Sequence, residues 1–247
     1  MKDSELKSRQ DLAAAYRLAD HFGFSEGIDN HLTLSLPEED DKYLLIPYGL
    51  HWSEVKASSL LVVDGEGKKI SGKGYAEPTA FLIHGAVHNS SPKNKCVMHT
   101  LMESALAIAM QEKGRLLMAD QNACRFYSNI NYVDDYEGLV LDKETANPIG
   151  KAMVDADILF LANHGIIVTG NSVYEAWESL YYLERACRAQ ILSMSIGNKL
   201  KIINGQIAKK VSDQVKEEAK GDSANAYRHF EALKRILINN GSEDYLE

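Results

Sequence analysis

The sequence has little cysteine, no surplus of basic residues and no long apolar run among its 247 residues. Its three cysteines, Cys96, Cys124 and Cys187, lie far apart without a Cys-X-X-Cys pair, which argues against a disulfide framework or a cysteine zinc site. We therefore expect reduced, buried thiols. No apolar stretch approaches the roughly 20 residues that span a bilayer, and the first ten residues are polar. We expect a cytoplasmic protein that makes no membrane contact.

Acidic residues outnumber basic ones, 35 to 27, and give a net charge of −8. Nucleic acid is also negatively charged, and no cluster of basic residues offsets the repulsion. We therefore expect no nucleic-acid binding. Small polar molecules and proteins remain as partners. With 45% hydrophobic residues, the chain can bury one large core. We expect one α/β domain over residues 1–202 and, over 203–247, a helical extension packed on that domain or on a neighbouring subunit.

The hydrophobic pattern alternates between the spacing of helices and that of strands. Helical spacing predicts helices at 9–22, 78–90, 101–111 and 172–194, the second of them beginning at Pro78. Two more helices, separated at Gly221, are predicted in residues 203–247. Short alternating or apolar segments predict strands at 31–36, 43–46, 60–63, 68–71, 96–99, 158–162 and 166–168. The two strands at 60–71 and the two at 158–168 have the turn residues of hairpins.

Two histidines occupy the ends of predicted strands. His99 closes strand 96–99, and His164 lies in the Asn-His-Gly turn between the last two strands. Thr100 and Glu103 have the spacing of a capping box, which predicts that a helix begins directly after His99. Because turns beside buried strands of α/β sheets are where ligands bind, His99 and His164 are the candidate site.

His84 and His88 are four residues apart on a predicted helix, the spacing at which two histidines grip one metal ion. The zinc-peptidase motif also needs a glutamate after the first histidine, but Gly85 stands there. Eight histidines in the chain make such a pair common by chance. We favour structural packing over metal ligation for this pair.

Six sequence blocks follow one another in a fixed order. They are Pro-Tyr-Gly-Leu at 47–50, Ala-Ser-Ser-Leu-Leu-Val-Val-Asp at 57–64, Ile-His-Gly-Ala-Val-His at 83–88, Cys-Val-Met-His-Thr at 96–100, Asp-Tyr-Glu-Gly at 135–138 and Asn-His-Gly at 163–165. Taken together, they closely resemble the class II aldolase/adducin family, and more narrowly its adducin-like branch. The similarity spans about residues 8–195.

The resemblance implies a three-layer α/β/α fold with a central, mostly antiparallel sheet flanked by helices. It also implies homotetramers with sites near subunit interfaces. In the family's aldolases, three histidines hold a divalent ion, usually zinc, and an upstream glutamate acts as acid/base. The ion polarises the carbonyl and hydroxyl oxygens of a keto-sugar phosphate. By this resemblance His99 and His164 are metal ligands, and Tyr136 is a catalytic candidate.

The metal site is incomplete by comparison with that pattern. The second histidine of the family's His-X-His pair is replaced by Leu101, and the glutamate position falls on Ala80, with Glu77 one helical turn upstream as a substitute. We therefore expect zinc to bind weakly or not at all. If a metal is bound, Glu103 or Asp134 could replace the missing ligand. For Glu103 we favour the other role, that of the carboxylate in the capping box with Thr100.

Other pocket positions match the adducin-like branch only in part. Where the branch usually has an arginine, an asparagine and a histidine, this chain has Ser35, Ile46 and Asp134, respectively. Matching positions, several of them expected around the pocket, are Asn30, His31, Thr33, Gln121, Tyr136 and Glu137.

Two functions follow from these observations. One is a metal-assisted aldehyde-lyase that acts on a small hydroxy-carbonyl compound, with a carboxylate or Tyr136 as acid/base. The other is an adducin-like interaction module whose catalytic site has decayed. We expect a homo-oligomer in either case.

Overall fold

The structure is a computed structural model that describes all residues except 1, 38, 40, 78–79 and 220–224. Within this part of the chain, eight strands form one sheet in the order β4-β3-β2-β1-β5-β8-β7-β6. Every neighbouring pair is antiparallel except β6 and β7, which are parallel. The strands are β1 (His31–Ser35), β2 (Lys42–Leu45), β3 (Leu61–Asp64), β4 (Lys69–Ser71), β5 (Cys96–Thr100), β6 (Ile130–Val133), β7 (Ile158–Leu161) and β8 (Gly165–Gly170).

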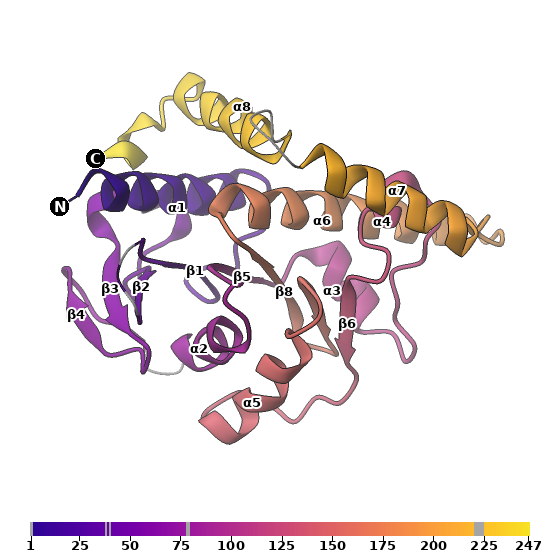
Figure 1. Cartoon of the computed structure of the whole chain (residues 1–247), viewed down its shortest axis with the longest axis horizontal. Helices are drawn as coiled ribbons and strands as arrows, with labels where there is room; N and C mark the ends of the chain where they lie inside the picture. Colours follow the sequence, from indigo (N-terminus) through magenta and orange to yellow (C-terminus); the bar gives the residue numbers. More distant parts are fainter. Residues whose placement is uncertain (1, 38, 40, 78–79, 220–224) are drawn as a thin grey trace.

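Helices cover both faces of the sheet and a further pair lies outside them (Figure 1). One face carries α1 and α6, with α8 packed on both of them and α7 packed on α4, and the other carries α2 and α5. The α-helices are α1 (Asp3–His21), α2 (Ala80–Ser90), α3 (Glu103–Ala109), α4 (Gln121–Cys124), α5 (Lys143–Ala152), α6 (Val173–Ser195), α7 (Gly205–Glu218) and α8 (Asn225–Asn239). Short 3₁₀ turns are η1 (Trp52–Glu54), η2 (Ala57–Ser59) and η3 (Glu243–Leu246). The predicted three-layer fold is confirmed.

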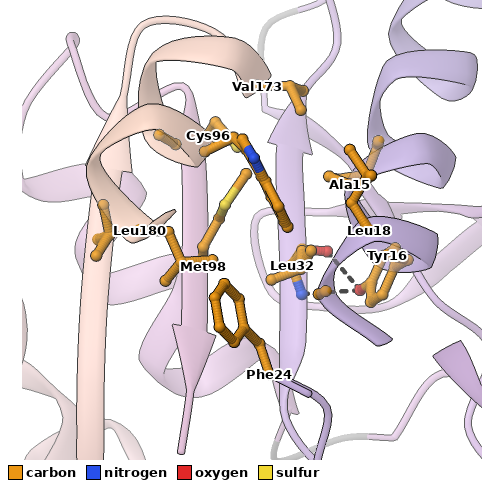
Figure 2. Close-up of a cluster of buried hydrophobic side chains, with 14 of the residues drawn as sticks. Ala15, Tyr16, Leu18, Phe24, Leu32, Cys96, Met98, Val173 and Leu180 are labelled. Atoms are coloured by element: carbon orange, nitrogen blue, oxygen red, sulfur yellow. Dashed lines mark hydrogen bonds between the residues drawn. The ribbon is translucent and has the colours of Figure 1, made fainter. Parts of the chain in front are cut away.

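The larger apolar core lies between the sheet and α1 and α6. Alternate residues of a strand point to opposite faces, so Leu32, Cys96 and Met98 face this core (Figure 2). The hydroxyl of Tyr16 donates to the Leu32 carbonyl at 2.6 Å and accepts from the Leu32 amide at 2.8 Å, which fixes α1 on β1.

A smaller apolar cluster lies on the other face, between the sheet, α2 and α5. It contains Val97 of β5 together with Val87 of α2 and Ile149 of α5. A Cβ atom at Gly150 would lie 2.6 Å from the Ala86 carbonyl oxygen, so glycine at this position allows α5 to approach α2 closely.

Most predicted elements are present, with some differences. Helix α3 begins at Glu103 rather than after Thr100. The helices α4 and α5, the strand β6 and the three 3₁₀ turns were not predicted. Pro78 and Gly221, assigned to a helix start and a helix break, lie outside the described residues. The three cysteines are free and buried, as expected. The boundary drawn at residue 202 stays a prediction. Among the helices that the structure describes, none is long and apolar enough to cross a membrane.

Candidate functional site

The two histidines singled out in the sequence lie in contact. β5 and β8 are paired so that His99 is opposite Ile167, and the turn from β7 to β8 brings His164 back over the end of β5. Asn163 has a φ of 55° in this turn, a left-handed conformation that asparagine tolerates well. The two Nε2 atoms are 3.2 Å apart and the ring centres 4.8 Å apart.

Hydrogen bonding determines which nitrogen of His99 carries the proton. Its Nδ1 lies 2.9 Å from the Ile166 carbonyl oxygen, which only accepts, so Nδ1 carries the hydrogen. Burial, and then the neighbouring His164, lowers the pKa of His99 to about 3. The neutral ring therefore presents the lone pair of Nε2 towards His164, whose own pKa burial also lowers. A histidine fixed through Nδ1 by a carbonyl is the usual arrangement of a metal ligand.

Leu101 stands where the family resemblance implies the second histidine of a His-X-His pair. Its side chain is half-buried and lies beside the turn residue after His164, because a Cβ atom at Gly165 would be 3.3 Å from Leu101 Cγ. An aliphatic side chain offers no lone pair to a metal. Over the described part of the chain, no three histidine, cysteine or acidic side chains are grouped so that they could hold an ion.

The donor set present therefore fits a metal only in part. Two nitrogens bound to one zinc ion at about 2.1 Å each lie roughly 3.3 Å apart, which agrees with the 3.2 Å separation of His99 and His164. The same distance is that of a hydrogen bond in which His164 Nε2 donates to the lone pair of His99 Nε2. The three-histidine set that the resemblance implies is not assembled among the described residues.

The suggested replacement ligands are held elsewhere. The Asp134 carboxylate accepts two hydrogen bonds from the Arg115 guanidinium, at 2.9 and 2.7 Å, and this partner lowers its pKa. Asp134 could ligate a metal only after this pair is broken. Glu103 is exposed at the start of α3.

The capping box predicted for Thr100 and Glu103 is wrong. Thr100 stays in β5, paired with Ile166, and Met102 precedes the helix without a side-chain cap. The Glu184 carboxylate of α6 takes the capping role, accepting from the Ser104 and Ala105 amides at 2.9 and 3.0 Å. Burial raises the pKa of Glu184. A residue 80 positions away thus determines where α3 begins.

Tyr136 lies beside the histidine pair. Its ring centre is 6.3 Å from that of His164, and both residues line a pocket of about 210 Å³ together with Glu137, Leu139 and other residues of the 133–149 region. The Tyr136 side chain is 49% exposed, so its phenol is accessible to a molecule entering this pocket.

His31 and Glu77 lie on the other side of His99. His31 of β1 is directly opposite His99 in the sheet, which places both side chains on one face. Burial lowers the pKa of His31 to about 4, against the opposing effect of the Glu77 and Asp29 carboxylates. Glu77 is therefore close enough to influence this part of the site.

Asn30 and Gln121, the other residues expected around the pocket, have no described contact with the His99–His164 pair. Asn30 precedes His31 with a φ of 64°, and within the described residues its buried amide nitrogen has no hydrogen-bond partner. Gln121 is the first residue of α4 and is exposed. No contact in the described structure joins Gln121 to the histidine pair.

His84 and His88 of α2 form a second histidine group that the sequence assigned to packing. Both contact the hydroxyl of Thr33 in β1, with His84 Nδ1 at 2.7 Å and His88 Nε2 at 2.8 Å. The ring of His84 also lies 6.1 Å from that of His31 and 6.5 Å from that of His99. The spacing of four residues indicated this group in the sequence, but the proximity of His84 to His99 appears only in the fold.

Residues 10–191 match the model of the class II aldolase and adducin N-terminal domain. The chain belongs to this family. A Pseudomonas aeruginosa protein named a putative class 2 aldolase is 34% identical, over 86% of this chain and 81% of its own length. Mouse alpha-adducin is 31% identical over 93% of this chain, which covers 33% of the adducin. A crystal structure of an aldolase II superfamily protein from Pseudomonas syringae has a TM-score of 0.91 and 31% identity, covering 100% of this chain and 98% of that one.

Proposed function

We propose that this chain is an aldehyde-lyase that acts on a small hydroxy-carbonyl compound in the pocket beside His99 and His164. The observation that carries the proposal is the pairing of their Nε2 atoms at 3.2 Å, with His99 oriented by the Ile166 carbonyl. A metal ion between the two nitrogens would replace the hydrogen bond that they form at this distance, and His164 lines an accessible pocket. Family membership and the relative named as a class 2 aldolase support the same reaction class.

His99 and His164 would hold a divalent metal, and zinc suits a set of neutral imidazoles. A bound ion of this kind polarises the carbonyl and hydroxyl oxygens of a substrate and stabilises the charge that develops when a carbon–carbon bond breaks. Two protein ligands bind zinc more weakly than three. His99 is buried and His164 half-buried, and burial lowers the pKa of both rings, so both are neutral at neutral pH.

Other side chains would act directly on the substrate. Tyr136, exposed in the pocket and beside His164, is positioned to hold or transfer a proton at a substrate oxygen. Glu77 is the alternative acid/base on the His31 side of the site. The apolar residues of the pocket would exclude water from the reacting carbons.

A cleavage assay tests the proposed reaction. The purified chain is incubated with zinc and a panel of phosphorylated and free ketoses, and release of an aldehyde is followed. We expect turnover of at least one compound and its loss in His164→Asn, while His229→Gln, a histidine change in α8 away from the pair, retains it. Equal turnover in His164→Asn, or none of any compound in the unmodified chain, would contradict the proposal.

We also propose a homo-oligomer, tetrameric as in the family's aldolases. Leu139 and Leu141, beside the pocket, are 74% and 64% exposed, and apolar side chains so exposed favour contact with another chain. Light scattering should give a multiple of the 27.5 kDa chain mass. A monomer at micromolar concentration would contradict this.

The second candidate is an adducin-like interaction module. It is favoured by Leu101 in a ligand position, by the Asp134–Arg115 pair and by the similarity to alpha-adducin. A folded chain without zinc affinity and without cleavage activity would favour this function over the lyase.

A further inference from the structure

The pocket beside the histidine pair has an apolar floor. It lies between the end of β6, the loop that follows it, the end of β7 and helix α5. Ile149 of α5 and Leu161 of β7 are buried members of the smaller apolar cluster, and Val133 and Val140 pack against the same cluster. All four side chains line the pocket. A molecule in this pocket therefore meets the edge of an aliphatic core.

The charged side chains that line this pocket are carboxylates. They belong to Asp135 and Glu137, which are exposed, and neither has an ion-pair partner among the described residues. No lysine or arginine of the described chain lines the pocket. Lys143, at the start of α5, pairs with Glu66 instead. Because like charges repel and no cation offsets the two carboxylates, the pocket disfavours an anion.

The helix N-terminus at this pocket is occupied by a third carboxylate. Backbone amides at the start of a helix commonly bind phosphate, and Thr145, in the first turn of α5, lines the pocket. Its amide donates to the Asp142 carboxylate at 2.9 Å, and its hydroxyl donates to the same oxygen at 2.9 Å. These hydrogen bonds lower the pKa of Asp142, so its carboxylate is charged at neutral pH. The chain itself thus fills the place that a phosphate group would take.

We propose that this pocket selects uncharged hydroxy-carbonyl compounds with a short aliphatic chain and disfavours phosphorylated ones. The inference rests on the proposed function, which places the substrate here. The volume of about 210 Å³ is below the roughly 300–1,000 Å³ of drug-sized sites, so the chain of the ligand is short. Its oxygens face Tyr136 and His164, and its carbons lie on the apolar floor. Each fully buried methylene should strengthen binding about 4-fold.

Saturation-transfer NMR on the chain in EDTA tests this selection separately from metal binding and from cleavage. Dihydroxyacetone and dihydroxyacetone phosphate differ in charge, and a series from hydroxyacetone to 1-hydroxy-2-hexanone differs in chain length. We expect the dissociation constant to fall at least about 10-fold along the series, because methylenes are added. Dihydroxyacetone phosphate should bind at least about 5-fold more weakly than dihydroxyacetone, because of its charge.

Two substitutions assign these effects to the pocket. Glu137→Lys replaces a repelling charge with an attracting one and should remove the discrimination against the phosphate. Asp155→Lys, at an exposed position that does not line the pocket, makes the same change in net charge and should keep it. Val140→Thr places a hydroxyl on the floor and should weaken binding of 1-hydroxy-2-hexanone about 3-fold. Val154→Thr, 47% exposed and outside the pocket, should not.

Circular dichroism checks that each variant is folded. If Val140→Thr is not, Glu137→Lys, at an exposed position, still tests the charge selection. Tighter binding of dihydroxyacetone phosphate than of dihydroxyacetone, equal affinities along the series, or no binding of any probe would overturn the inference. Equal effects in the pocket variants and their controls would also overturn it.

The cleavage assay separates this inference from the proposed function. Cleavage of phosphorylated ketoses alone would support the lyase and overturn the selection of uncharged compounds. Preferred binding of uncharged hydroxyketones, without cleavage of any compound, would support the selection and contradict the lyase.

Discussion

The two faces of strands β1 and β5 differ in what they bury. Towards α1 and α6 the strands present Leu32, Cys96 and Met98 to the larger apolar core. Towards α2 the neighbouring positions present His31 and His99, which have lowered pKa values. Burying an imidazole contributes less to stability than burying an aliphatic side chain of similar size. The two faces of the same strands therefore differ in polarity: one is apolar, and the other carries buried imidazoles beside its own smaller apolar cluster.

The largest effect on stability should come from the apolar face. Trp177 is fully buried and its ring lies within 6.3 Å of those of Phe22, Phe24 and Phe230. We expect Trp177→Ala to lower the free energy of unfolding by about 3–5 kcal/mol. Urea denaturation measures this. The zinc affinity of the folded variant should be unchanged, and a large loss of affinity would show that the two faces are not independent.

The buried histidines on the α2 side of the sheet should make the free energy of unfolding depend on pH. Burial lowers the pKa of His88 to about 4, and the unfolded histidine has a pKa of about 6.5. Between these values the unfolded chain binds more protons, so stability is greatest above pH 6.5 and falls as the pH falls to about 4. Each histidine protonated only in the unfolded state contributes about 1.4 kcal/mol per pH unit.

Metal-free protein in urea at pH 7.5 and 5.5 measures that slope. His88→Gln should have a shallower slope than the unmodified chain, while the Trp177→Ala variant should keep the original slope at lower stability. An unfolding free energy that does not change over this pH range would show that the buried histidines do not make the α2 face acid-sensitive.

The effect of Leu101→His should appear in metal affinity rather than in stability. An additional imidazole beside His99 and His164 should tighten zinc binding by about 10-fold or more, with a change in unfolding free energy below about 1.5 kcal/mol. Chelator competition and urea denaturation give the two values. A folded variant without tighter binding would show that the pocket cannot accept a ligand at position 101.

A smaller effect is expected at the junction between the site and the apolar face. Glu184 accepts the amides of Ser104 and Ala105, and in Glu184→Gln one oxygen is replaced by a donor that cannot accept. We expect a loss of about 1–2 kcal/mol of unfolding free energy. Hydrogen exchange at α3 should increase with it. Unchanged exchange there would mean that Glu184 does not hold the start of this helix.

The fold and the primary histidine pair were predictable because their signals are local. Strand alternation, the Asn-His-Gly turn and the ordered family blocks place His99 and His164 at neighbouring strand ends. The start of α3 was not predictable, since Glu184 lies 80 residues from Ser104. Helix α5 buries Ala146, Ile149 and Gly150 at helical spacing, but Pro148 inside it argues against a helix in the sequence. Strand β6 is half-buried throughout, so it has no alternation.

The state of His84 was also beyond the sequence. A spacing of four residues on a helix is equally consistent with packing and with ligation. Only the position of Thr33 between His84 and His88 fixes the protons and leaves His84 Nε2 unpaired. The proton positions of His84 therefore depend on contacts between β1, α2 and the Asn94 carbonyl, which the sequence does not reveal.

The central claim is that His99 and His164 together hold a divalent ion. Zinc binding to the unmodified chain, His99→Asn and His164→Asn, measured by chelator competition on protein shown to be folded, tests it most directly. One ion per chain in the unmodified protein, lost in both variants, is the predicted result. Binding that persists unchanged in either variant, or no binding in the unmodified chain, would contradict the claim.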